Sequence, residues 1–159
     1  MRAAPARSGL MLAMRAAALA AILALSGCAH LVVLHDPLSA DEHNDLGIAY
    51  EASGQPVLAE KQYRRSLALD GKQSRTWVNL GNAEAAQLRW RDAEKSYRRA
   101  LREDPADPDA LNNLAVALHR QNRSRDEARA LAARAVAAGG ERESVYRATL
   151  AEVNEAGSR

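Results

Sequence analysis

The chain has 159 residues, of which 47% are hydrophobic and 26% charged, and its formal net charge is +2. This length suits one domain, and the scarcity of β-branched residues together with the absence of Phe favours helices over strands. Three basic residues and no acidic ones precede residue 28, so the remainder is close to neutral and nucleic acid is not an expected partner. A single Cys excludes an internal disulfide.

The first 27 residues have the three zones of a bacterial signal peptide. A basic region comes first, an apolar run from Ala16 to Leu25 follows, and small residues lead to Cys28. The apolar run is too short to cross the ~30 Å hydrocarbon core of a membrane. The ending Leu25-Ser26-Gly27-Cys28 resembles the lipobox of bacterial lipoproteins. This resemblance implies that Cys28 is lipid-modified, for example with palmitate, and is the first residue of the mature protein.

A lipid-modified Cys28 implies attachment to a membrane, because two or more acyl chains anchor a protein durably. Enteric lipoproteins retained at the inner membrane tend to have Asp after the Cys, whereas this chain has Ala29. The resemblance therefore implies the periplasmic face of the outer membrane in the cell envelope. Residues 28–38 are predicted to be the lipidated Cys and a tether, since they lack a helical period. The alternatives are a free Cys packed as a small hydrophobe and an uncleaved anchor.

From residue 40 onward the sequence repeats with a period of 34 residues. Leu46-Gly47 aligns with Leu80-Gly81, Tyr63 aligns with Tyr97, and Leu114-Ala115 lies one period further on. A period of this length indicates a helical repeat protein. The predicted repeats span about 40–73, 74–107 and 108–142, and a helix over about 142–156 has one apolar side suited to capping the stack. Together they form a domain over residues 39–157.

Capping residues predict where several helices begin. Ser39 with Glu42 has capping-box spacing at the first helix, and Ser124 with Glu127 has it at the sixth. The latter would account for one extra residue in the turn of the third repeat. Asp107-Pro108 places an N-cap residue before a proline at the first position of the fifth helix.

The matched residues resemble the tetratricopeptide repeat, a helix pair with Trp, Leu-Gly and an aromatic on its first helix and Ala, an aromatic and Ala on its second. The second repeat fits best, with Glu84 in place of the usual aromatic of the first helix. The resemblance implies an all-α solenoid of about three helix-turn-helix repeats plus a C-terminal capping helix. The glycines of the first helices are expected to face the alanines of the second, with Tyr97 filling a neighbouring gap.

In this family the first helix of each pair lines a concave groove. Asn44, Asn82 and Asn112 occupy such positions and are expected to pair with the backbone of an extended peptide, because an amide side chain both donates and accepts hydrogen bonds. Solvated groove residues without a ligand are the alternative. The positions with which some members clamp a terminal carboxylate hold Asn44 and Ile48, so no clamp is predicted. The full set of predicted partner-binding residues is Asn44, Ile48, Arg75, Val78, Asn82, Asn112, Val116 and His119.

The sequence predicts no enzymatic activity. It has no Gly-rich phosphate loop and no HExxH motif, and an acylated Cys28 is not a nucleophile. No catalytic residue, cofactor, metal or small-molecule substrate is therefore expected. The predicted function is a periplasmic, membrane-anchored interaction module, an adaptor or assembly factor that binds a protein or peptide in its groove. The alternatives are a non-catalytic accessory of an envelope enzyme, such as a peptidase or peptidoglycan hydrolase, and a structural lipoprotein that self-associates.

Overall fold

A computed structural model describes residues 36–155 of the chain. The predicted signal peptide, Cys28 and most of the predicted tether lie outside this range. The described residues form seven helices and no strand. No helix among them is both long and apolar enough to cross a membrane. The helices are α2 (Ala40–Ala52), α3 (Pro56–Leu69), α4 (Ser74–Ala86), α5 (Trp90–Glu103), α6 (Pro108–Arg120), α7 (Arg125–Ala138) and α8 (Glu143–Glu155).

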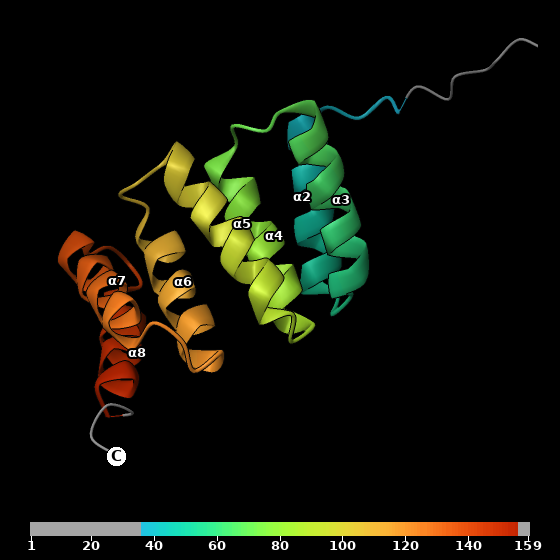
Figure 1. The fold of residues 1–159 in the computed structure, drawn as a ribbon. Helices are drawn as coiled ribbons and strands as arrows, with labels where there is room; N and C mark the ends of the chain where they lie inside the picture. The colour runs from blue at the N-terminus through green and yellow to red at the C-terminus, as the bar shows by residue number, and fades with distance from the viewer. Residues whose placement is uncertain (1–35, 156–159) are drawn as a thin grey trace, which may run out of the picture. The chain divides into compact units, whose positions relative to one another are not determined.

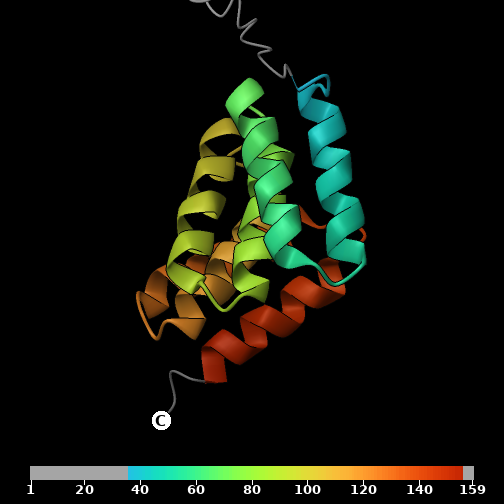
Figure 2. The same ribbon diagram turned by 90° about the vertical axis from the view of Figure 1, so that its right-hand side faces the viewer.

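The helices form three pairs that stack in chain order (Figure 1). Helices α2 and α3, α4 and α5, and α6 and α7 each pack against each other, while α8 packs on α6 and α7. Figure 2 shows α8 running at a steep angle to α2 and α3. Within the described residues, each pair contacts only its neighbours along the stack. This is the architecture of a solenoid, so the predicted all-α solenoid with a terminal helix is confirmed.

Two of the three predicted helix starts are confirmed. At α2, the Glu42 backbone N–H donates to the Ser39 hydroxyl (3.2 Å) and the Ser39 N–H donates to the Glu42 carboxylate (2.8 Å). At α6, the Asp107 carboxylate accepts from the second and third backbone N–H groups of the helix, after Pro108. The capping box predicted at Ser124 is wrong. The extra residue of that turn leaves Ser124 left-handed (φ +47°), and its hydroxyl does not bond the start of α7.

Glycine allows a tyrosine ring to enter the crossing between the helices of the first two repeats. A Cβ atom added at Gly47 would lie 2.4 Å from a ring carbon of Tyr63, and one added at Gly81 would lie 2.4 Å from a ring carbon of Tyr97. These rings, and not the alanines expected from the sequence, are the nearest neighbours of the glycines. Both tyrosines are buried, so neither ring can retreat from a larger residue.

The apolar core runs along the stack in two clusters. The smaller cluster joins α3 to α4, and the larger one extends from α4 to α8. Helix α8 contributes Tyr146 and Val153, each 2% exposed. It therefore covers apolar residues that the last repeat would otherwise expose, as a capping helix must.

Candidate binding groove

The first helices of the three pairs, α2, α4 and α6, lie beside one another and form one face of the stack, called here the groove face. Two clefts open on it. The first cleft, of about 430 Å³, lies between α2 and α4 and is lined by Asp41, Asn44, Asp45, Gln73, Ser74, Arg75 and Thr76. The second cleft, of about 230 Å³, lies between α4 and α6, reaches α5, and is lined by Asn82, Ala85, Trp90, Tyr97, Asn113 and Val116.

Six of the eight predicted partner-binding residues lie on or beside this surface. Asn44 and Arg75 line the first cleft, and Asn82 and Val116 line the second. Ile48 is 37% exposed on α2. His119, the sixth, is half-buried on α6. Its Nε2 atom lies 3.5 Å from a carboxylate oxygen of Glu152 on α8.

The other two predicted residues, Val78 and Asn112, are not accessible on the groove face. Val78 is 6% exposed and belongs to the core, and Asn112 is 3% exposed. The Asn112 amide donates to the Asn113 side-chain carbonyl (3.3 Å), while its own carbonyl oxygen has no partner among the described residues. The expectation that these two side chains meet a peptide is therefore corrected. Asn44, at the same repeat position, is also buried (8% exposed), although it lines the first cleft.

The asparagines link successive repeats. The side-chain carbonyl of Asn44 accepts from the Asn79 amide (3.0 Å) and from the Thr76 hydroxyl (3.2 Å), which joins α2 to α4. The carbonyl of Asn82 accepts from the Asn113 amide (2.9 Å), which joins α4 to α6. Asn79 and Asn113 are absent from the predicted set, although they stand one period apart in the sequence. Reading the repeat period for polar as well as apolar residues would have found them.

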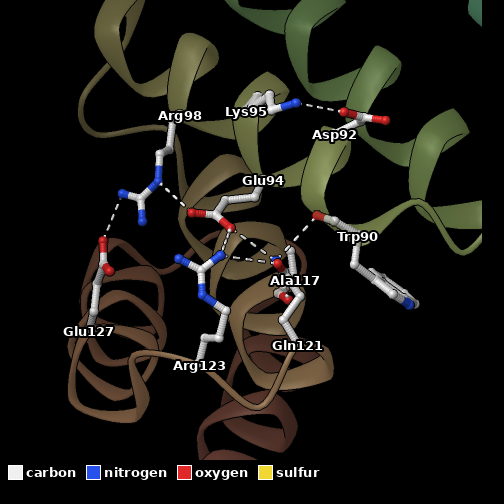
Figure 3. Close-up of polar contacts among 9 residues, drawn as sticks. All are labelled: Trp90, Asp92, Glu94, Lys95, Arg98, Ala117, Gln121, Arg123 and Glu127. Atoms are coloured by element: carbon white, nitrogen blue, oxygen red, sulfur yellow. Dashed lines mark hydrogen bonds and ion pairs between the residues drawn. The ribbon is translucent and has the colours of Figure 1, made fainter.

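A second polar network joins the repeats at the second helices, and Figure 3 shows it around Glu94. The Glu94 carboxylate accepts from the Gln121 amide (3.0 Å) and from Arg98 (3.0 Å), and it pairs with Arg123 (3.5 Å). Burial raises the pKa of Glu94, but the hydrogen bonds from Gln121 and Arg98 outweigh it and hold the pKa below its usual value. Arg98 also reaches Glu127 on α7 (2.7 Å). The network thus fastens α5 to the third repeat.

The same network occurs one period earlier. Glu60 accepts from the Gln87 amide (2.8 Å) and pairs with Arg64 (2.7 Å) and Arg89. Arg64 and Arg98 thus pair with Glu60 and Glu94 on their own helices and belong to larger networks between repeats. These ion pairs help to hold the stack together.

The buried acid Glu84 also has structural partners. Its carboxylate accepts from the Ser96 hydroxyl (2.7 Å) and from Arg64 (3.1 Å), and only 3% of the residue is exposed. Burial raises the pKa of Glu84, while Ser96 and Arg64 oppose the shift. Within residues 36–155, no three His, Cys, Asp or Glu side chains gather as metal ligands would.

Antiparallel helix pairs that recur every 34 residues and stack in one direction define a helical-repeat solenoid. The tetratricopeptide-repeat family model matches residues 78–143. The first tetratricopeptide domain of Spaghetti (RPAP3), solved with an HSP90 peptide, has a TM-score of 0.70 and 16% identity, over 76% of this chain and 94% of that one. Residues 78–143 thus match the tetratricopeptide-repeat model, and the described part of the chain has the fold of such a domain.

A second solved structure shares this fold, and one further protein matches part of the sequence. The Yersinia enterocolitica type III secretion chaperone SycD, solved with a peptide of the translocator YopD, has a TM-score of 0.65 and 19% identity, over 72% of this chain and 91% of that one. The type IV pilus assembly protein PilF of Pseudomonas aeruginosa is 36% identical over 58 residues, which is 36% of this chain and 23% of PilF. The chain thus matches about a quarter of the length of that relative.

Proposed function

We propose that this protein is a lipid-anchored, periplasmic interaction module that captures a segment of another envelope protein and assists its assembly. The observation that carries the proposal is the pair of clefts on one face of three successive first helices. Such a face presents a rigid, elongated surface, because the asparagine and glutamate networks fix each repeat on the next. An extended segment that crosses the first helices would meet both clefts.

The comparisons support a role in protein binding and assembly. SycD and the first RPAP3 domain hold peptides of other proteins in the solved structures that share this fold. PilF, by its name, serves type IV pilus assembly. An assembly factor or adaptor is therefore favoured over an accessory of an envelope enzyme or a self-associating structural protein.

The proposal includes a non-catalytic mode of action. The buried acids Glu60 and Glu84 are engaged by arginine, glutamine or serine side chains of neighbouring helices. Side chains held in this way link neighbouring helices, and both residues are buried away from the groove face.

Membrane attachment is proposed through Cys28, on the basis of its lipobox-like sequence. Mass spectrometry of the mature protein should find a lipid-modified Cys28 at the amino terminus, in the outer-membrane fraction. Cys28→Ser should move the protein out of that fraction without changing its circular-dichroism melt. An amino terminus at Met1 or Ala29 would contradict the anchor.

The capture of a partner is tested separately in cells. Chemical crosslinking of the tagged full chain should give one envelope protein in a discrete complex, and Cys28→Ser should lower its yield because the two proteins no longer share a membrane. A crosslinked species containing only this chain would instead favour self-association.

A further inference from the structure

From the second cleft and the charges beside the first, we infer that the partner segment is extended and carries an apolar anchor residue with a Lys or Arg about four or five residues away. This inference rests on the proposed function and specifies the chemistry of the partner. The second cleft holds the anchor, and the acidic side of the groove face at α2 selects the positive charge.

The size of the second cleft suits a side chain and not a small-molecule ligand. Its volume of about 230 Å³ is below the roughly 300–1,000 Å³ of sites for drug-sized ligands. Its apolar walls come from Ala85 on α4, from Trp90 and Tyr97 on α5, and from Val116 on α6. Buried apolar side chains that enter such pockets supply much of the affinity of an interface.

Several polar groups of the second cleft bond to one another. The carbonyl oxygen of Asn82 accepts from both the Tyr97 hydroxyl (3.0 Å) and the Asn113 amide (2.9 Å). These bonds fix the three side chains in place and leave that oxygen little capacity to accept from a ligand. The cleft is therefore preorganised for an apolar group, and a polar group entering it would lose its hydrogen bonds to water.

The charge of the groove face is set by α2. This helix contains four acidic residues and no Lys or Arg, whereas α3 behind it has three basic residues and one acidic residue. Asp41 and Asp45 are exposed in the first cleft, where Arg75 is the single basic residue. An approaching basic side chain therefore meets complementary charge at this end of the face and an acidic one meets repulsion.

The distance between the clefts sets the spacing. They lie on opposite sides of α4, one at residues 74–76 and the other at residues 82–85. From the rise of a helix and the spacing of packed helices, their centres are roughly 15 Å apart. An extended chain covers that distance in about four or five residues.

Selection of a phage-displayed random dodecapeptide library on the full chain, purified in detergent, tests this inference. Enriched peptides should combine an aliphatic or aromatic residue with Lys or Arg four or five positions away. An acidic consensus, or one without an apolar residue, overturns the inference but leaves peptide capture intact. The absence of any enriched peptide overturns both this inference and the proposed function.

Variants then locate the selected peptide. Binding, followed by fluorescence polarisation, should fall at least tenfold for Val116→Asp and for Ala85→Gln, which fills the second cleft. The matched control Val57→Asp alters a valine that is 63% exposed on α3 and should bind normally. If both cleft variants melt like the parent and bind the peptide with unchanged affinity, the apolar residue of the peptide does not bind in the second cleft.

A charge reversal tests the acidic end. Asp45→Lys should weaken binding several-fold at low salt and reduce its salt dependence. Asp126→Lys, at an exposed position on α7, is the matched control and should leave binding unchanged. Equal effects of the two reversals would show that α2 does not select the charge.

Discussion

The first two repeats and the third build the same helix crossing from different residues. The first two combine a glycine on one helix with a tyrosine on the other, as in Gly81 and Tyr97, whereas the third has Ala115 and Ala132 at the same repeat positions, both fully buried. The third repeat also has Leu118 and Leu131 where the second has Glu84 and Ser96. The three repeats therefore keep the same helix crossing, while side chains at matching positions differ in volume and polarity.

The two junctions between repeats also differ from the junction between the last repeat and α8. Glu60 with Gln87 and Glu94 with Gln121 join the first three helix pairs through charged networks. At the last junction, α8 buries Tyr146 and Val153, and its polar links there include the Tyr146 hydroxyl donating to Asp109 (2.9 Å) and Arg129 on α7 donating to Asn154 (2.9 Å). Glutamate networks thus occur where the stack continues, whereas α8 adds large buried apolar side chains where it ends.

The largest expected effect is that of Gly81→Ala. The added methyl would overlap the buried Tyr97 ring, and overpacking of this kind costs about 1–3 kcal/mol or more. This loss outweighs the ~1 kcal/mol by which alanine favours a helix. Urea unfolding should therefore show a clear loss of stability, whereas Ala115→Gly in the third repeat should cost only about 1 kcal/mol plus a small cavity.

A double substitution sharpens that prediction. Gly81→Ala combined with Tyr97→Ala recreates the alanine pair of the third repeat, so the double variant should be more stable than the two single losses predict, by about 0.5–3 kcal/mol. Additive losses would mean that the two residues do not share a packing constraint.

The next effect concerns the charged junctions. Glu60→Ala removes the partner of Gln87, Arg64 and Arg89, and we expect a loss of about 1–3 kcal/mol. The arginine side chains are 56% and 36% exposed, so water screens part of the charge and the lower end of this range is expected. Glu127→Ala breaks the ion pair with Arg98, in which each side chain is 39% exposed. It should cost less than about 1 kcal/mol in the same measurement.

The sequence allowed the fold to be predicted because glycine, tyrosine and capping residues act locally and recur at a fixed spacing. Burial within the groove face was harder to infer. Asn44, Val78 and Asn112 occupy one repeat position, and the valine among them was a sign that this position faces the next repeat. The role of Trp90 and Tyr97 in the second cleft depends on how α5 packs behind α4 and α6, which the helical period does not specify.

A smaller effect distinguishes two serines with the same sequence signature. Ser39→Ala removes a complete capping box and should lower the free energy of unfolding by about 1 kcal/mol. Ser124→Ala should leave it nearly unchanged, because the Ser124 hydroxyl caps no helix. Thermal melts of the two variants, compared with the parent, check this. A loss at Ser124 as large as that at Ser39 would contradict the left-handed turn.

The smallest effect is a difference in pH dependence between two acids. The folded-state pKa of Glu84 is raised above 4.5, so its ionisation destabilises the fold as the pH rises through that pKa. The pKa of Glu94 is lowered below 4.5, so its contribution is present above 4.5 and is lost as the pH falls. Relative to the parent, Glu84→Gln should gain stability as the pH rises from about 4 to 7 and Glu94→Gln should lose it. The difference in unfolding free energy between variant and parent should change with pH in opposite directions for the two variants. A change in the same direction would contradict these environments.

Capture of another protein by the groove face can be tested by photo-crosslinking in living cells. A photoreactive amino acid at position 85 lies in the second cleft, and one at position 57 lies on the exposed side of α3. We expect a discrete crosslinked protein from position 85 and none from position 57. Crosslinking from position 57 alone, or from neither position, would contradict capture by the groove face.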